Sequence, residues 1–214
     1  MAGPTTYTAV LDACVLYPAP LRDILLSLAD AGLFHARWTL DIQHEWTRNL
    51  LSNRPDLNAE QLRTTQERMI AAIPDCLITR YEPLIAGLSL PDADDRHVLA
   101  AAITGHADVI VTLNLKDFPA DTLADYNLEA QHPDDFVMNQ LELREHEALA
   151  AIKRMRARLR NPPRTPEEFM ATLARNGLVQ TVRGLRQRVE LIYLRQRFMS
   201  RLDSCIRQAS LFIK

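Results

Sequence analysis

The fold of this chain is set above all by short apolar segments that alternate with helical patterns. Residues 7–11 and 108–112 each form an apolar, β-branched run that is too short for a helix. Apolar residues recur at helical spacing in two stretches around them, from Leu21 to Ala29 and from Val98 to Ile103. Weaker strand candidates fall at residues 34–40, 77–79 and 128–130. This alternation predicts an α/β fold with a parallel sheet covered on both faces.

Strand patterns stop after Pro133, and the rest of the chain has a different character. Residues 134–160, 166–175 and 178–213 have helical patterns. Thr165 followed by Pro166 is typical of a helix start, with Thr at the cap and Pro at the first helical position. We therefore expect two regions, an α/β domain over residues 1–135 and a helical region over residues 136–214.

Length and composition exclude several classes of protein. At 214 residues the chain is expected to hold one domain, or one domain with a smaller appendage. No apolar run approaches the ~20 residues of a membrane helix, and the first residues lack a secretion pattern. The three cysteines lie far apart without a CxxC pair, which argues against a disulfide framework or a zinc knuckle. We expect a cytoplasmic protein with no membrane segment.

Charge is distributed unevenly along the chain. Residues 1–143 hold 9 Lys and Arg against 21 Asp and Glu, a net charge of −12. Residues 144–214 hold 16 against 6, a net charge of +10. An acidic first part and a basic last part suggest two different roles.

Acidic and amide residues gather where the predicted strands and helices meet. Asp12 follows the first strand, Glu45 lies early in a helix, and Asn114 and Asp117 follow the strand at residues 108–112. Asp92, Asp94 and Asp95 open another helix. In an open parallel sheet, ligands bind beyond the carboxyl ends of the strands. Several carboxylates meeting there would repel one another unless a cation bound, and Mg²⁺ and Mn²⁺ prefer such oxygens.

Each of these residues also has an ordinary structural interpretation. Asp92 could cap its helix, with Asp95 completing a capping box. Asp117 could be a turn residue before Phe118. A charged Asp12 directly after a buried strand is harder to explain, because an unpaired buried charge is costly. The joint pattern favours a site over these separate explanations.

The order and spacing of these motifs resemble the PIN-domain nucleases, a family that includes the VapC-type toxins of bacterial toxin–antitoxin pairs. The resemblance spans about residues 5–135, and it implies a three-layer α/β/α sandwich around a parallel sheet. It rests on residues 10–16, on Glu45 before Arg48-Asn49-Leu50, and on two longer segments, residues 91–102 and 107–118.

The resemblance implies a role for each acidic position. Asp12, Glu45 and Asp95 match the first three acids of the family, and Asp95 is preferred over Asp94 because of its spacing before Leu99. The fourth position is Asn114 here, where the family often has Asp, and Asp117 stands three residues on. We expect catalytic roles for the two matching aspartates, for Glu45 and for Asp117.

Metal binding follows from the same comparison. The implied ligands of Mg²⁺ or Mn²⁺ are Asp12, Asp95, Glu45 and Asn114, while Thr112 would support the site through its hydroxyl group. Such an ion reverses the local charge for an anionic phosphodiester and lowers the pKa of a bound water.

The implied function is that of a metal-dependent endoribonuclease, the toxin of a toxin–antitoxin pair. Its partners would be an RNA substrate and an antitoxin protein, and a homodimer is plausible. A phosphatase on a similar sheet fits less well, because the second acid of a DxD motif is absent at Cys14. A catalytically weak nucleic-acid-binding or regulatory module is the alternative, favoured by Asn114 and by the basic C-terminal region.

The basic C-terminal region offers arginines that could bind RNA phosphates. We expect substrate contacts from Arg154 and Arg158, from Arg96 beside the acidic cluster, and from Thr112 and Asn114. A solvated helix face, a cover over the acidic domain and a partner-binding surface remain open alternatives. The histidines near the site, the two tryptophans and Cys14 are expected to be structural: His44, His97, His106, Trp38 and Trp46.

Overall fold

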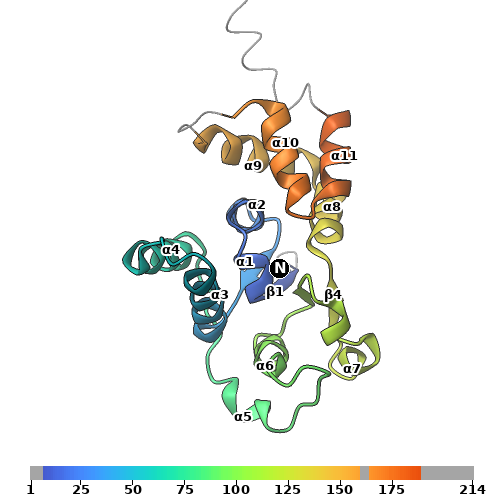
Figure 1. Ribbon diagram of the computed structural model, residues 1–214. Helices are drawn as coiled ribbons and strands as arrows, with labels where there is room; N and C mark the ends of the chain where they lie inside the picture. Colours follow the sequence, from blue (N-terminus) through green and yellow to red (C-terminus); the bar gives the residue numbers. More distant parts are fainter. Residues whose placement is uncertain (1–6, 160–163, 189–214) are drawn as a thin grey trace, which may run out of the picture.

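A computed structural model of the protein describes residues 7–159 and 164–188. Its centre is a parallel sheet in the order β2-β1-β3-β4 (Figure 1). Ala9 pairs with Val109 and Val10 with Ile110, and all four side chains are fully buried. The strands are β1 (Thr8–Leu11), β2 (His35–Arg37), β3 (Val109–Val111) and β4 (Glu129–Gln131). The predicted parallel sheet is therefore confirmed.

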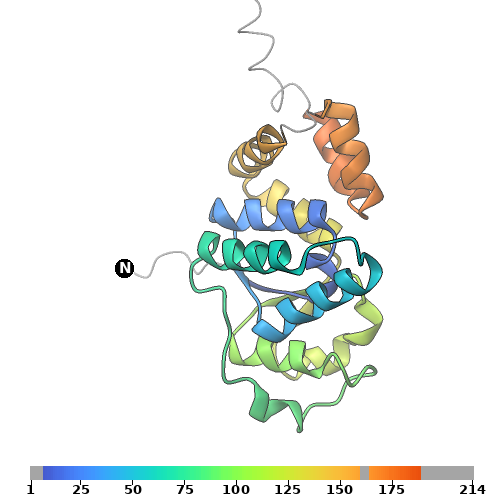
Figure 2. The same ribbon diagram turned by 60° about the vertical axis from the view of Figure 1, so that its left-hand side comes forward.

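Helices cover both faces of the sheet. On one face α2 (Ala19–Asp30) packs against β2, and on the other α6 (Arg96–Thr104) packs against β1 and β3 (Figure 2). At one edge α3 (Leu40–Asn53) contacts α1 (Ala13–Leu16). The remaining short elements and α4 lie around this frame: α4 (Ala59–Ala72), α5 (Glu82–Ile85), η1 (Leu115–Asp117) and α7 (Ala120–Ala124). The α/β/α layers agree with the prediction.

The C-terminal helices form a further layer beyond α2. Figure 1 shows α9 and α10 above α2, and both contact it. The helices are α8 (Pro133–Leu143), α9 (Glu145–Arg158), α10 (Pro166–Arg175) and α11 (Val179–Gln187). The start of α10 is a complete capping box between Thr165 and Glu168, as the sequence suggested in part. The predicted helix at residues 178–213 is seen to Gln187, and residues 189–214 lie outside the described part.

The predicted single helix over residues 134–160 is wrong, because the chain breaks at Arg144. This residue has φ −141° and ψ 63°, and its guanidinium donates to the carbonyl oxygen of Gly32 at 2.8 Å. The break turns α9 back onto α2. At the other end, His132 caps α8, so residue 135, the expected division between the two regions, lies within the first turn of that helix.

Two other local expectations also differ from the structure. The helix expected from Asp92 begins at Arg96, because Asp92 Oδ1 instead accepts from the Asp94 amide in a turn. Residues 77–79 form no strand and contribute only an isolated bridge to Trp38.

The core runs from the sheet into the C-terminal helices. Trp38 and Trp46 are fully buried, as expected of core residues, and Phe34 packs edge-on against Phe136 of α8 at 4.7 Å. Among the described residues, no helix is long and apolar enough to cross a membrane.

Candidate active site

Asp12 lies where β1 ends and α1 begins, and hydrogen bonds fix its carboxylate. The side chain is only 3% exposed. Thr112, which follows β3, donates its hydroxyl to Asp12 Oδ2 at 2.7 Å, and Cys14 Sγ donates to the same oxygen at 3.0 Å. Burial raises the pKa of Asp12 above its ordinary value, although these two hydrogen bonds oppose the rise and the charge of Glu45 adds to it.

Hydrogen bonds also tie the loop after β3 to the end of β1. The Leu113 amide donates to Cys14 Sγ at 3.1 Å, and the Asn114 amide donates to Thr112 Oγ1 at 3.0 Å. Burial and the neighbouring Asp12 charge raise the pKa of the Cys14 thiol, which keeps it protonated as a donor. Cys14 is therefore a half-buried residue that hydrogen bonds hold at the site.

Glu45 comes from the second turn of α3, with Ile42 and Trp46 of the same helix buried in the core. His97 of α6 places its Nε2 atom 3.3 Å from Glu45 Oε2. Burial alone would lower the pKa of His97, but the hydrogen bond and charge of Glu45, with smaller effects of Asp12 and Asp41, raise it overall. The other ring nitrogen, Nδ1, is buried with no partner in the described residues. His97 thus lines the site beside Glu45, whereas sequence analysis placed it near the site and expected only a structural role.

The acidic residues come together around Asp95. It stands at the N-cap of α6 without a side-chain capping bond. Burial, followed by the charges of Asp12, Asp92, Asp117 and Glu45, raises its pKa to about 7. Carboxylates that are distant in sequence therefore repel one another at the carboxyl ends of β1 and β3, where the sequence predicts a site.

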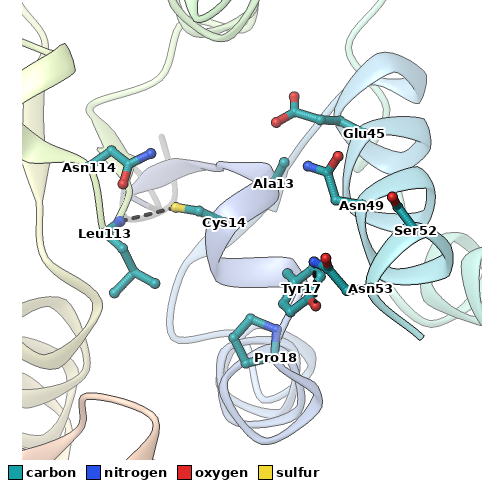
Figure 3. Close-up of a pocket in the computed structure, with 10 residues that line it drawn as sticks. All are labelled: Ala13, Cys14, Tyr17, Pro18, Glu45, Asn49, Ser52, Asn53, Leu113 and Asn114. Carbon is teal, nitrogen blue, oxygen red and sulfur yellow. Dashed lines mark hydrogen bonds between the residues drawn. The ribbon is translucent and has the colours of Figure 1, made fainter.

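Two cavities lie on either side of Glu45. The first has a volume of about 450 Å³ and is bounded by α1, α3 and the loop after β3 (Figure 3). Its lining includes Cys14, Asn49 and Asn114. The second has a volume of about 580 Å³ and lies between α3 and α6, where Asp95 and His97 line it together with further polar residues: Asp41, His44, Arg48 and Asp94. We call these the α1–α3 cavity and the α3–α6 cavity.

The predicted arginine contacts are not all near this site. Arg96 adjoins Asp95, but its Nε donates to the Ala93 carbonyl at 2.9 Å. Arg158 donates to Ser27 Oγ at 2.6 Å and lines a separate cavity between α2, α4 and α9. Arg154 is exposed on α9. The structure therefore brings Thr112 and Asn114 to the acidic cluster, but not Arg158.

The donor set suits a hard divalent cation. Carboxylate and amide oxygens line the cluster, and burial together with the charges of neighbouring carboxylates raises the pKa of Asp95, an unfavourable arrangement of charge that a cation would relieve. Within residues 7–159 and 164–188, no group of three His, Cys, Asp or Glu side chains is already arranged as a metal site. Binding would therefore require these side chains to draw together.

Comparisons with known proteins match both parts of the chain. The family model described as "PIN domain" matches residues 8–116, and the one described as "VapC50 C-terminal domain" matches residues 133–187. A curated Mycobacterium tuberculosis (strain ATCC 25618 / H37Rv) protein, "Putative ribonuclease VapC50", is 46% identical over 93 residues. That alignment covers 44% of this chain and 54% of the relative, so the chain spans about half the relative's length.

No solved structure matches the chain significantly. The PIN-domain match covers about half of the 214 residues and contains the matched acidic positions Asp12, Glu45 and Asp95. The chain therefore belongs to the PIN-domain family.

Proposed function

We propose that this protein is a metal-dependent endoribonuclease, the toxin of a bacterial toxin–antitoxin pair. The observation that carries the proposal is the set of carboxylates around Asp95, whose charges add to the effect of burial in raising the pKa of Asp95 to about 7. A relative described as a ribonuclease supports RNA as the substrate. The proposal places the protein in the cytoplasm with RNA, an antitoxin as its protein partner, and a homodimer as its assembly.

The acidic residues would together hold the metal ion that acts on the substrate. Asp12 and Asp95 would hold Mg²⁺ or Mn²⁺, with Asn114 or Asp117 completing the site. When bound, the ion would polarise the phosphoryl group and lower the pKa of the attacking water. Thr112 would keep Asp12 in one orientation, since its hydroxyl already donates to that carboxylate at 2.7 Å.

Glu45 would act on the attacking water. The hydrogen bond from His97 holds one carboxylate oxygen of Glu45, and the side chain lines both cavities. Glu45 would orient the water or hold a second metal ion. The raised pKa of His97 favours its protonated form beside the cluster.

The two regions of the chain would have separate tasks. The nuclease domain would end just before α8, which begins at Pro133, and the helical region would follow it. Arg96 and exposed Arg154 remain candidates for phosphate contacts farther along an RNA strand. Arg158 is engaged with Ser27 and is a weaker candidate.

A metal-dependence assay on single-stranded RNA tests this function. Cleavage should stop in chelator and return with Mg²⁺ or Mn²⁺. Asp12→Asn and Asp95→Asn should each reduce cleavage at least ~100-fold, because a lost metal ligand removes charge stabilisation worth several kcal/mol. Asp125→Asn, an exposed carboxylate at the end of α7, is the matched control and should cleave normally.

Cleavage that persists in chelator or in both site variants would refute the assignment. Salt-sensitive RNA binding without cleavage would instead support the alternative of a binding module. The toxin role has its own test, in which expression of the chain arrests growth and a small protein encoded beside it relieves the arrest.

A further inference from the structure

The α1–α3 cavity has a neutral lining, although it adjoins the acidic cluster. Among the described residues that line it, only Glu45 carries a charge, and none is Lys or Arg. A phosphate group would find no cation there to balance it. At about 450 Å³ the cavity has the size of a small-molecule site. Its occupant should therefore be neutral.

Three polar side chains in this lining have unused hydrogen-bonding capacity. Asn49 and Ser52 come from α3, and Asn114 faces them from the loop after β3 (Figure 3). Within the described residues, no hydrogen bond is made by any of these three side chains. An Asn amide offers a donor and an acceptor side by side, which matches the edge of a nucleobase.

The same cavity also presents apolar surface. The Leu113 side chain is 38% exposed and lines the cavity. Its position is fixed, because its amide donates to Cys14 Sγ at 3.1 Å. Tyr17 adds an aromatic ring whose hydroxyl accepts from Asn53 Nδ2 at 3.2 Å. Rings of unstacked bases pack against surfaces of this kind in single-stranded RNA recognition.

Glu45 joins this neutral cavity to the charged α3–α6 cavity, where Arg48, Asp95 and His97 lie. A nucleotide likewise joins a neutral, flat base to an anionic sugar-phosphate group. We infer that the α1–α3 cavity is a nucleobase subsite, which takes one unpaired base of the RNA strand next to the cleaved phosphodiester. This inference rests on the proposed function, and it adds to that function the group of the substrate that the protein recognises, a single nucleobase.

Binding of short RNAs with one missing base tests the subsite directly. The probes are single-stranded eight-nucleotide RNAs, each with an abasic ribose at one position. Their affinity for the full chain is measured by fluorescence anisotropy in Ca²⁺ buffer at fixed salt. One abasic position should weaken binding about tenfold, because stacking on a side chain supports each recognised base.

Two variants decide whether this loss arises in the cavity. In the double variant Asn49→Ala with Leu113→Ala, the loss of affinity caused by the abasic position (the abasic penalty) should fall below about threefold. The edge and the face of the base both lose their contacts in this variant. Gln61→Ala removes an exposed amide from α4, outside the cavity, and should keep the full penalty. A penalty that persists in the double variant would overturn the inference.

The outcomes also separate the subsite from the proposed function. If RNA is cleaved but every abasic probe binds like the intact one, the nuclease proposal stands and the subsite is refuted. A protein segment filling the cavity would give the same flat profile. If the penalty depends on the cavity but no metal-dependent cleavage occurs, the subsite stands and the nuclease proposal fails. If no RNA binds, both fall.

Discussion

Replacing Asp95 by Asn should stabilise the metal-free protein while removing its response to metal. The substitution keeps the side-chain shape and deletes one charge from a repulsive cluster. Helix α6 loses little, because Asp95 makes no side-chain capping bond. A residue proposed as a metal ligand is thus expected to cost stability when the metal is absent.

The magnitude follows from the pKa of Asp95, which is raised from 3.8 to about 7. At ~1.4 kcal/mol per pKa unit, this shift corresponds to an upper limit of about 4 kcal/mol. Asp95 is only half-buried, so solvent screening reduces the expected gain to about 1.5 kcal/mol at pH 8.

The direction of the pKa shift determines the pH range over which Asp95 changes the stability of the protein. A carboxyl group whose pKa is raised in the folded state destabilises that state once it ionises. The loss of stability therefore grows as pH rises from about 4 to about 7. The advantage of Asp95→Asn should accordingly be about a third as large at pH 5 as at pH 8.

Urea unfolding in chelator at pH 5 and pH 8 measures these differences. Asp94→Asn, on the same loop but exposed, is the control and should change stability by less than about 0.5 kcal/mol. Added Mg²⁺ should then stabilise the wild type by ~1.4 kcal/mol at ten times the dissociation constant, and the variant much less. An Asp95→Asn protein that is less stable than wild type in chelator at pH 8 would refute the reasoning.

Three further substitutions test the packing and hydrogen bonds that hold this arrangement. Gly105→Ala would place a Cβ atom 2.6 Å from Ile78 Cδ1, so it should lower the free energy of unfolding by about 1–3 kcal/mol, as measured by thermal unfolding. Gly87→Ala is the control and should leave stability unchanged, because the nearest atom to its Cβ is 3.6 Å away. Thr112→Val removes the hydroxyl that donates to Asp12, so it should lower the free energy of unfolding by about 1–3 kcal/mol and abolish most of the metal binding measured by calorimetry. Thr112→Ser keeps the hydroxyl and should restore both. Asp134→Ala should unpair two amides at the start of α11 and expose that helix to limited proteolysis.

The sheet and its acidic edge could be predicted because both follow from local patterns. A short buried run such as residues 108–112 identifies a strand without knowledge of its neighbours. Parallel strands then place their carboxyl ends together, so Asp12 and the residues after Thr112 had to meet. Thr165 followed by Pro166 likewise predicts a helix start from neighbouring residues alone.

The pairs that complete the site could not be predicted in this way. His97 contacts Glu45 across 52 positions, and Cys14 receives the Leu113 amide across 99. No periodicity connects such residues, because only the packing of α6 and α3 beside the sheet brings them together. The late start of α6 has a similar origin, since Asp92 binds the Asp94 amide within a turn instead of capping the helix.

Two arginines of the basic C-terminal region have structural partners among the described residues. Arg158 bonds to Ser27 of α2, and Arg188 bonds to Glu145 of α9 at 2.5 Å. These basic residues therefore serve to pack the C-terminal helices on the acidic domain and on one another. Arg48, by contrast, lines the α3–α6 cavity itself. Arg48 would therefore supply a positive charge near the proposed scissile phosphate, and the neutral α1–α3 cavity would select the nucleotide.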